Sequence, residues 1–185
     1  MSATGPGQSL LLLLDVVALL DRERIAYGVV GALAASVYGT VRATTDADAL
    51  VSLPAPKLAA LERRLRRQGF TAALHRGDAD DPIPALIAVS DGFGNRVDLL
   101  GGLRGLDPAA FERTLPVPFS GRTLRIIGRE DFIAMKCFAG GPQDLLDAQD
   151  AMRATNRRVD LDLLRRITRR FGRPAADALE RLLAA

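Results

Sequence analysis

Two aspartates one residue apart, Asp46 and Asp48, carry the clearest chemical signal in the sequence. They precede the apolar run from Ala49 to Leu53, so the segment is typical of a β-strand. Because side chains alternate along a strand, both carboxylates would lie on one face, about 6 to 7 Å apart along the backbone. Like charges held together disfavour each other's ionisation unless a cation lies between them, and Mg²⁺ prefers oxygen ligands. The pair therefore indicates a divalent-cation site; two solvated acids at a strand edge are the alternative.

A glycine at the end of an apolar segment is the second signal. Residues Ile25 to Val30 are typical of a strand, and Gly31 with Ala32 leads it into a small-residue helix that reaches Tyr38. Backbone N–H groups at a helix start are unpaired, and the positive end of the helix dipole faces outward there. Because Gly31 has no Cβ, an anion can approach the main chain closely. We expect a phosphate-binding turn here; an ordinary turn is the alternative.

Polar side chains farther along the chain can complete such a site. Arg42 and Thr44 carry a planar guanidinium and a hydroxyl, and both groups bind phosphate oxygens. Asp98 lies within an apolar run that ends at Leu100, where an unpaired buried carboxylate would be neutralised or destabilising. A metal ion would satisfy this acid, and so would a salt bridge to Arg96 or Arg42.

A lysine within a predicted helix is a further charged candidate. The helix runs from Arg129 to Ala139, and Lys136 falls on its apolar stripe between Phe132 and Ile133. An ammonium in that position needs an anion nearby, and snorkelling to the helix edge is the alternative. Lys136 therefore belongs with the candidate anion-binding residues.

Length and composition agree with a globular protein of a reducing compartment. The 185 residues are 48% hydrophobic with a net charge of +3, which suits one domain or a domain with a small appendage. Cys137 is the only cysteine and His75 the only histidine, so an internal disulfide is excluded and no zinc-ligand spacing occurs. The run Leu10 to Leu14 is too short to span a bilayer, and no basic residue precedes it as in a signal peptide. We expect a cytoplasmic protein without membrane contact.

Hairpin and crossover signals together predict a mixed sheet. A glycine-containing turn separates the strand candidates Ala85 to Ser90 and Arg96 to Leu100, whereas helices separate other strands. We expect an α/β (α+β) fold in which a mixed sheet is flanked by helices and followed by a C-terminal helical tail. A soft boundary divides residues 1–127, the α/β core, from residues 128–185, the helical segment packed on it. The three aspartates would then lie at one edge of a cleft that the helical tail closes.

Residues 31–48, GALAASVYGTVRATTDAD, resemble the nucleotidyltransferase signature of the polymerase-β superfamily. In that signature a Gly-Gly or Gly-Ser turn is followed by a helix, a glycine, Arg-x-Thr and Asp-x-Asp. The stretch is most similar to bacterial toxin-type (abortive infection, AbiEii-like) and minimal nucleotidyltransferases. One departure is Ala32, which stands where the family has a second glycine or a serine, so a serine contact to the triphosphate is missing.

The resemblance implies a nucleotidyltransferase fold and an enzyme that transfers a nucleoside monophosphate from an NTP such as ATP to a hydroxyl acceptor, using two Mg²⁺ ions. In such a site the catalytic and metal-binding residues are Asp46, Asp48 and Asp98, and Asp98 also takes the acceptor's proton. The residues that would bind the nucleotide phosphates are Gly31, Ala32, Arg42, Thr44 and Lys136.

Two other acidic pairs have different explanations. Asp78 and Asp80 repeat the Asp-x-Asp spacing, but glycine and proline flank them and no apolar strand carries them, so we expect a loop with solvated acids. Asp144 and Asp147 follow Gln143, where the related proteins often have a lysine in a Lys-Asp-x-x-Asp run. We expect Asp144 to be a helix-capping or salt-bridge residue rather than a catalytic one.

The resemblance leaves the acceptor and the biological setting open. A tRNA or other RNA, a protein hydroxyl and a small aminoglycoside-like molecule are all compatible with the site. The toxin-type relatives imply a toxin–antitoxin or phage-defence system, with a cognate antitoxin or toxin as partner. The alternative is a catalytically inactive protein of the same fold that binds RNA or a partner protein, and Ala32 and Gln143 are the sequence reasons for it.

Overall fold

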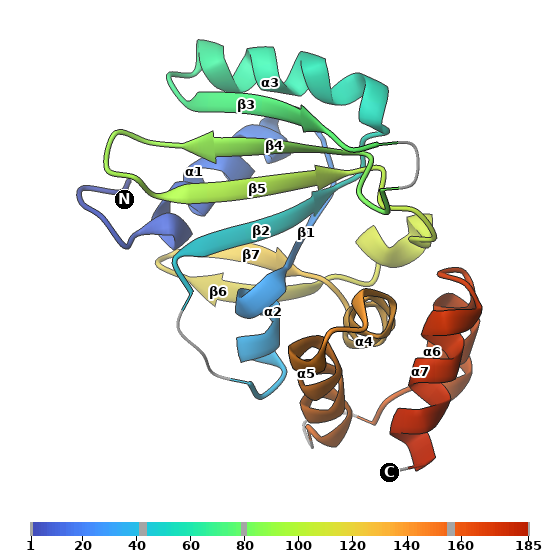
Figure 1. Cartoon of the computed structure of the whole chain (residues 1–185). Coiled ribbons are helices and arrows are strands. Elements are labelled where there is room, and N and C mark those ends of the chain that lie inside the picture. Colours follow the sequence, from blue (N-terminus) through green and yellow to red (C-terminus); the bar gives the residue numbers. More distant parts are fainter. Residues whose placement is uncertain (1, 41–43, 79–80, 155–157, 185) are drawn as a thin grey trace.

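A mixed β-sheet forms the centre of the molecule (Figure 1). The computed structural model describes residues 2–40, 44–78, 81–154 and 158–184, and within them the sheet has seven strands in the order β3-β4-β5-β2-β1-β7-β6. The strands are β1 (Tyr27–Val30), β2 (Asp46–Val51), β3 (Thr71–Arg76), β4 (Ala85–Ser90), β5 (Arg96–Gly101), β6 (Leu115–Phe119) and β7 (Arg122–Ile126).

Helices flank the sheet, and those of the C-terminal part gather at one end of the molecule (Figure 1). The helices are α1 (Ser9–Arg22), α2 (Gly31–Val37), α3 (Leu58–Arg67), α4 (Arg129–Ala139), α5 (Pro142–Arg153), α6 (Leu161–Arg169) and α7 (Arg173–Ala184), with short 3₁₀ helices η1 (Ala55–Lys57) and η2 (Pro108–Phe111). The predicted fold class, a mixed sheet flanked by helices with a helical C-terminal part, is confirmed.

The register of β2 with its two neighbours decides which side chains meet. β2 and β5 are parallel, and their Cα partners include Asp48 with Asp98 and Leu50 with Leu100. On its other side β2 runs antiparallel to β1, which sets Asp48 opposite Val30. The end of β1, where α2 begins, therefore lies beside the acidic part of β2.

The two faces of the sheet are covered differently. Strands β4 and β5 alternate between fully and partly buried side chains, as expected when only one face is tightly packed. The packed face buries Ala49, Ile87 and Leu99 in the core shared with α1 and α3, and Figure 1 shows α1 behind the sheet. Asp48 and Asp98 belong to the other, partly buried face.

The leucine-rich N-terminal segment is a core helix. α1 buries Leu13 and Leu20 completely. Its first residue, Ser9, donates a hydrogen bond to the carbonyl of Thr45 and accepts one from the N–H of Arg96 at 3.0 Å, so α1 is fastened to the starts of β2 and β5. Within the described ranges, the helices are all too short or too polar to cross a membrane.

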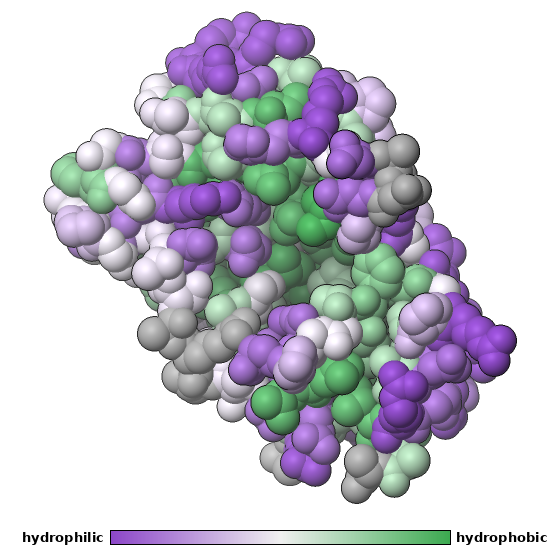
Figure 2. All heavy atoms as spheres, viewed as in Figure 1, coloured by the Kyte–Doolittle hydropathy of each residue, from purple (hydrophilic) through white to green (hydrophobic). Residues whose placement is uncertain are grey.

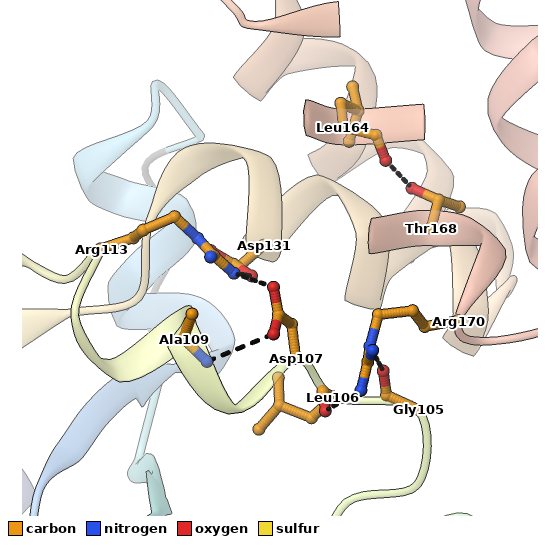
Figure 3. Close-up of polar contacts among 9 residues, drawn as sticks. All are labelled: Gly105, Leu106, Asp107, Ala109, Arg113, Asp131, Leu164, Thr168 and Arg170. Carbon is orange, nitrogen blue, oxygen red and sulfur yellow. Dashed lines mark hydrogen bonds and ion pairs between the residues drawn. The ribbon is translucent and has the colours of Figure 1, made fainter. Parts of the chain in front are cut away.

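The C-terminal helices share one hydrophobic core with the sheet. Phe132 of α4 and Leu164 of α6 are buried in the same cluster as the strand residues. Just after α6, Arg170 donates to the carbonyl groups of Gly105 and Leu106 at 3.2 and 3.4 Å, which ties the loop after β5 to the helical segment (Figure 3). We keep residue 128 as the proposed boundary between the α/β core and this segment.

Candidate active site

The three predicted carboxylates lie on one face of two adjacent strands. Asp48 of β2 is the direct partner of Asp98 of β5, and Asp46 is the partner of Arg96. Asp46 is exposed, whereas Asp48 and Asp98 are half-buried. The structure thus brings these residues together across about fifty residues of intervening chain, because the parallel register aligns the acidic part of β2 with that of β5.

The surroundings of Asp48 disfavour the ionised form of its carboxyl group. Burial raises the pKa of Asp48, and the charges of Asp98 and Asp46 raise it further, while Arg96 and Lys136 act in the opposite direction. The net effect is upward because the acids and the loss of solvent outweigh the two cations. A cation at this face would relieve the cost of ionising Asp48.

Gly31 makes room for Asp48. It begins α2 with φ of +64°, a left-handed conformation, and a Cβ on this residue would lie 2.2 Å from Oδ2 of Asp48. A side chain is therefore excluded both by the backbone conformation and by the neighbouring carboxylate. From the sequence we expected a glycine here because a phosphate could approach the backbone. The structure adds a second reason: the register of β1 with β2 places Asp48 where a side chain of residue 31 would lie.

Asp98 is held by Arg96. Nε of Arg96 donates to Oδ1 of Asp98 and Nη2 donates to Oδ2, both at 2.9 Å, so the guanidinium binds both carboxylate oxygens. Of the partners considered for this buried acid, the structure contains the salt bridge to Arg96. Arg42 lies outside the described residues.

The hydroxyl groups of the two threonines directly before β2 form hydrogen bonds with Asp46. Thr44 donates its hydroxyl to the carbonyl of Asp46 at 2.9 Å, and the N–H of Asp46 donates back at 3.3 Å. Thr45, which the sequence pattern did not single out, donates to Oδ1 of Asp46 at 2.8 Å. A hydroxyl directly before an acidic strand position was the signal that could have found it. Ala32 lies in the first turn of α2, where its carbonyl accepts a hydrogen bond of 2.9 Å from the hydroxyl of Ser36.

Lys136 is paired with two acids of α5. Its Nζ lies 2.7 Å from Oδ1 of Asp144 and 2.7 Å from Oδ2 of Asp147, and its side chain is only 12% exposed. The ammonium therefore does not snorkel to solvent, and the salt-bridge role predicted for Asp144 is confirmed. The contact of Lys136 with Asp147, whose side chain is fully buried, was not predicted, although the i,i+3 spacing from Asp144 places both acids on one helix face.

A cavity of about 440 Å³ adjoins the acidic face. Gly31, Asp48, Lys136 and Asp144 contribute its polar groups. The rest of the lining is apolar and comes from β1, β2, β5, α4 and the two loops next to β4 and β5, namely Val30, Leu50, Pro82, Ile83, Leu100, Leu103, Phe132, Met135, Phe138 and Ala139. Figure 2 shows the molecule hollowed on this face, with an apolar floor bordered by hydrophilic residues.

The donor set fits divalent cations in residue type and backbone position. Carboxylate oxygens on neighbouring strands are the ligands that Mg²⁺ prefers, and the pKa of Asp48 is raised by burial first and then by the charges of Asp98 and Asp46. In the described ranges, however, no three acidic, histidine or cysteine side chains converge closely enough to hold a metal ion. Arg96 binds both oxygens of Asp98, so the third of the predicted carboxylates is engaged in a salt bridge in this conformation.

Solved structures of nucleotidyltransferases share this fold, while neither a protein-family model nor a curated protein matches the sequence. ANT(2'')-Ia, in complex with adenylyl-2''-tobramycin, has a TM-score of 0.58 and 13% identity over 89% of this chain and 96% of that one. An antigenic nucleotidyltransferase-like protein from Paracoccidioides brasiliensis has a TM-score of 0.56 and 15% identity over 98% and 90%. Lincomycin-bound LnuA, a lincosamide antibiotic adenylyltransferase, has a TM-score of 0.50 and 14% identity over 83% and 100%. At these identities the similarity shows the fold, and the chain has a nucleotidyltransferase fold.

Proposed function

We propose that this chain is a polymerase-β-type nucleotidyltransferase that uses Mg²⁺ to transfer a nucleoside monophosphate from an NTP to a hydroxyl acceptor. The observation that carries the proposal is the pairing of Asp48 with Asp98, with Asp46 on the same face, beside a ligand-sized cavity. The fold shared with solved nucleotidyltransferases supports it.

The reaction joins the acceptor oxygen to the α-phosphorus and breaks the bond between that phosphorus and the oxygen leading to the β-phosphate, so pyrophosphate leaves. Asp46, Asp48 and Asp98 would hold the divalent ions. When bound, Mg²⁺ offsets phosphate charge and lowers the pKa of the acceptor hydroxyl. Asp98 would take the proton that the acceptor loses, which requires a carboxylate oxygen free of Arg96.

The nucleotide would bind at the polar end of the cavity. Its phosphates would contact the backbone at Gly31 and Ala32 and the ammonium of Lys136, with Arg42 and Thr44 as further contacts. Fixed positive groups of this kind stabilise the charge that accumulates on a pyrophosphate leaving group. The cavity volume of about 440 Å³ lies within the range of small-molecule sites, and its apolar floor suits the nucleoside part.

We propose a hydroxylated small molecule as the first acceptor class to test, because two similar structures contain an adenylylated aminoglycoside and a lincosamide antibiotic. RNA, tRNA included, and protein hydroxyls are the other acceptor classes. A toxin–antitoxin or phage-defence role with a cognate partner, in the cytoplasm, remains a prediction from the sequence. Growth arrest on expression of the wild type but not of Asp48→Ala would support a toxin.

Incubation with labelled NTPs, Mg²⁺ and fractionated cell extract tests the proposal. We expect label to enter the small-molecule, RNA or protein fraction, and we expect Asp46→Asn to reduce transfer by about a hundredfold or more. Asp78→Asn is the matched control, since Asp78 is an exposed loop acid away from the cavity lining. Transfer that persists undiminished in Asp46→Asn would refute the assignment.

A second candidate is a catalytically inactive member of the fold that binds RNA or a partner protein. Arg96 and Lys136 favour it, because both cations are already neutralised by acids of the chain itself. Calorimetry separates the two functions. An enzyme binds NTP with Mg²⁺ and loses this binding when the metal is chelated, whereas an inactive module binds RNA or protein equally well with and without Mg²⁺.

A further inference from the structure

Arg96 is the cation of this face to which the proposed reaction gives no role. It begins β5, two positions before Asp98, so both side chains project from the same face of the strand. Its guanidinium makes two parallel hydrogen bonds of 2.9 Å to Asp98. Such a two-point contact matches the geometry of a carboxylate and occupies both oxygens.

The acids of this face outnumber the cations that face them. Arg96 lies in register with Asp46 and is attracted by Asp46 and Asp48 as well as by Asp98, which raises the pKa of Arg96 through the hydrogen bond and charge of Asp98 first. Lys136, the other described cation that acts on Asp48, is bound to two acids of α5. One guanidinium therefore serves three carboxylates among the described residues.

We propose that Arg96 is an internal counterion: its guanidinium occupies the place beside Asp98 that a second divalent cation would take. Arg96 must release Asp98 before the metal site is complete. The inference rests on the proposed function, since it concerns the same three acids. Arg96 is a positioning residue, because it acts through Asp98. The two bonds to Asp98 then explain why no three ligands converge among the residues that the structure describes.

The local structure allows this exchange without a change in the fold. The side chain of Arg96 is 50% exposed, so its guanidinium can turn toward solvent and the contact can open. The backbone N–H of Arg96 is bound by Ser9 of α1 and stays in place when the guanidinium moves. A divalent ion carries twice the charge of the guanidinium and binds several carboxylates at once, so it replaces Arg96 when its concentration is sufficient.

Binding of Mn²⁺, followed by electron paramagnetic resonance of the free ion, tests the proposal without any turnover. We expect Arg96→Gln to bind Mn²⁺ about three- to tenfold more tightly than the wild type, because Asp98 no longer has a competing partner. Arg96→Lys keeps the charge but loses the two-point contact, so its affinity should lie between the two. Arg76→Gln removes one exposed charge from the edge strand β3 and is the control, with a change of less than about twofold.

The outcomes separate this inference from the proposed function. Equal Mn²⁺ affinity in the wild type and Arg96→Gln would overturn the counterion role while leaving the metal site intact. No Mn²⁺ binding by either protein would overturn both. Improvement of equal size in Arg76→Gln would reduce the effect to general charge and also overturn the counterion role.

A spectroscopic measurement reports on Arg96 itself. The side-chain Nε–H signal of Arg96, assigned by its loss in Arg96→Lys, should shift as Mg²⁺ is added to ¹⁵N-labelled protein. Asp98→Asn should place this signal near its Mg²⁺-saturated position before any metal is added, because the ion pair is already absent. A signal that stays fixed in the wild type while Mg²⁺ binds would contradict release of Asp98.

Discussion

Two arginine–aspartate clusters of this protein shift the pKa of an aspartate in opposite directions. In the first, Arg113 donates to both oxygens of Asp131 at 2.8 and 2.7 Å and also to Asp107 at 3.1 Å (Figure 3). Burial pushes the pKa of Asp107 up, but the N–H of Ala109 and the guanidinium of Arg113 outweigh it, so the pKa falls below its usual value. Asp131 is 3% exposed and fully paired.

The acidic face of β2 and β5 is the second cluster. There the pKa of Asp48 is raised, since burial and two neighbouring acids outweigh the cations that oppose them. The comparison separates a structural cluster, in which hydrogen bonds and cations outweigh burial, from a face on which burial and neighbouring acids outweigh the cations. An imbalance of this kind destabilises the empty fold and is relieved by a bound cation, which is why such clusters mark functional sites.

Removing Arg113 from the first cluster should have the largest effect on stability. Arg113→Met leaves Asp131 buried without its partner, so we expect the free energy of unfolding to fall by about 3 to 5 kcal/mol in urea denaturation. Arg165→Met is the control, because its ion pair with Glu180 is exposed, and it should leave the free energy of unfolding unchanged within error. If Arg113→Met were as stable as the wild type, the first cluster would have no structural role and the comparison would fail.

Adding a side chain at Gly31, next to Asp48, should lower the free energy of unfolding by a smaller amount. Gly31→Ala forces a Cβ against Asp48 in a left-handed conformation, and we expect it to lower the free energy of unfolding by about 2 kcal/mol. Gly140→Ala is a matched control, since Gly140 has a φ of +68° and the nearest atom to an added Cβ is 3.7 Å away. The difference between the two variants, measured by the same denaturation, isolates the contact with Asp48. Equal losses would show that Asp48 does not depend on this glycine.

Removing the charge of Asp48 should have the smallest effect, and a stabilising one. The folded state holds the proton of Asp48 more tightly than the unfolded state, so stability falls as the pH rises from 3.8, the ordinary pKa of an aspartate, through the raised pKa, and stays lower above it. Asp48→Asn removes this cost, and at pH 7 we expect the Tm to rise by roughly 2 to 4 °C without added metal.

Scanning calorimetry between pH 3 and 8 measures this effect. The gain in Asp48→Asn should shrink toward zero in acid, where both states of the wild type are protonated, and added Mg²⁺ should stabilise the wild type but not the variant. Asp78→Asn should show no such pH dependence. A gain that is independent of pH, or a loss of stability in Asp48→Asn, would mean that Asp48 is not strained.

Features that depend on local sequence patterns were predicted better than features that depend on long-range contacts. Strand alternation placed Asp46 and Asp48 on one face, and an acid within an apolar run marked Asp98 before its strand partner was known. The same reasoning could not choose between a metal and Arg96 as the partner of Asp98, because i,i+2 neighbours on a strand lie close enough for either arrangement. The contact of Asp147 with Lys136 and that of Thr45 with Asp46 were not predicted, since they depend on the directions of the side chains.

The amino-acid sequence by itself determined the strand and helix types, the mixed sheet and the identity of the acids, because these follow from periodicity and turn residues that act over a few positions. The tertiary structure alone decided that Asp48 stands opposite Asp98, that Gly31 must lack a side chain to admit Asp48, and that Lys136 is bound by two acids. The physical reason is that register and helix packing are set by burial of the whole core, which aligns residues far apart in the chain.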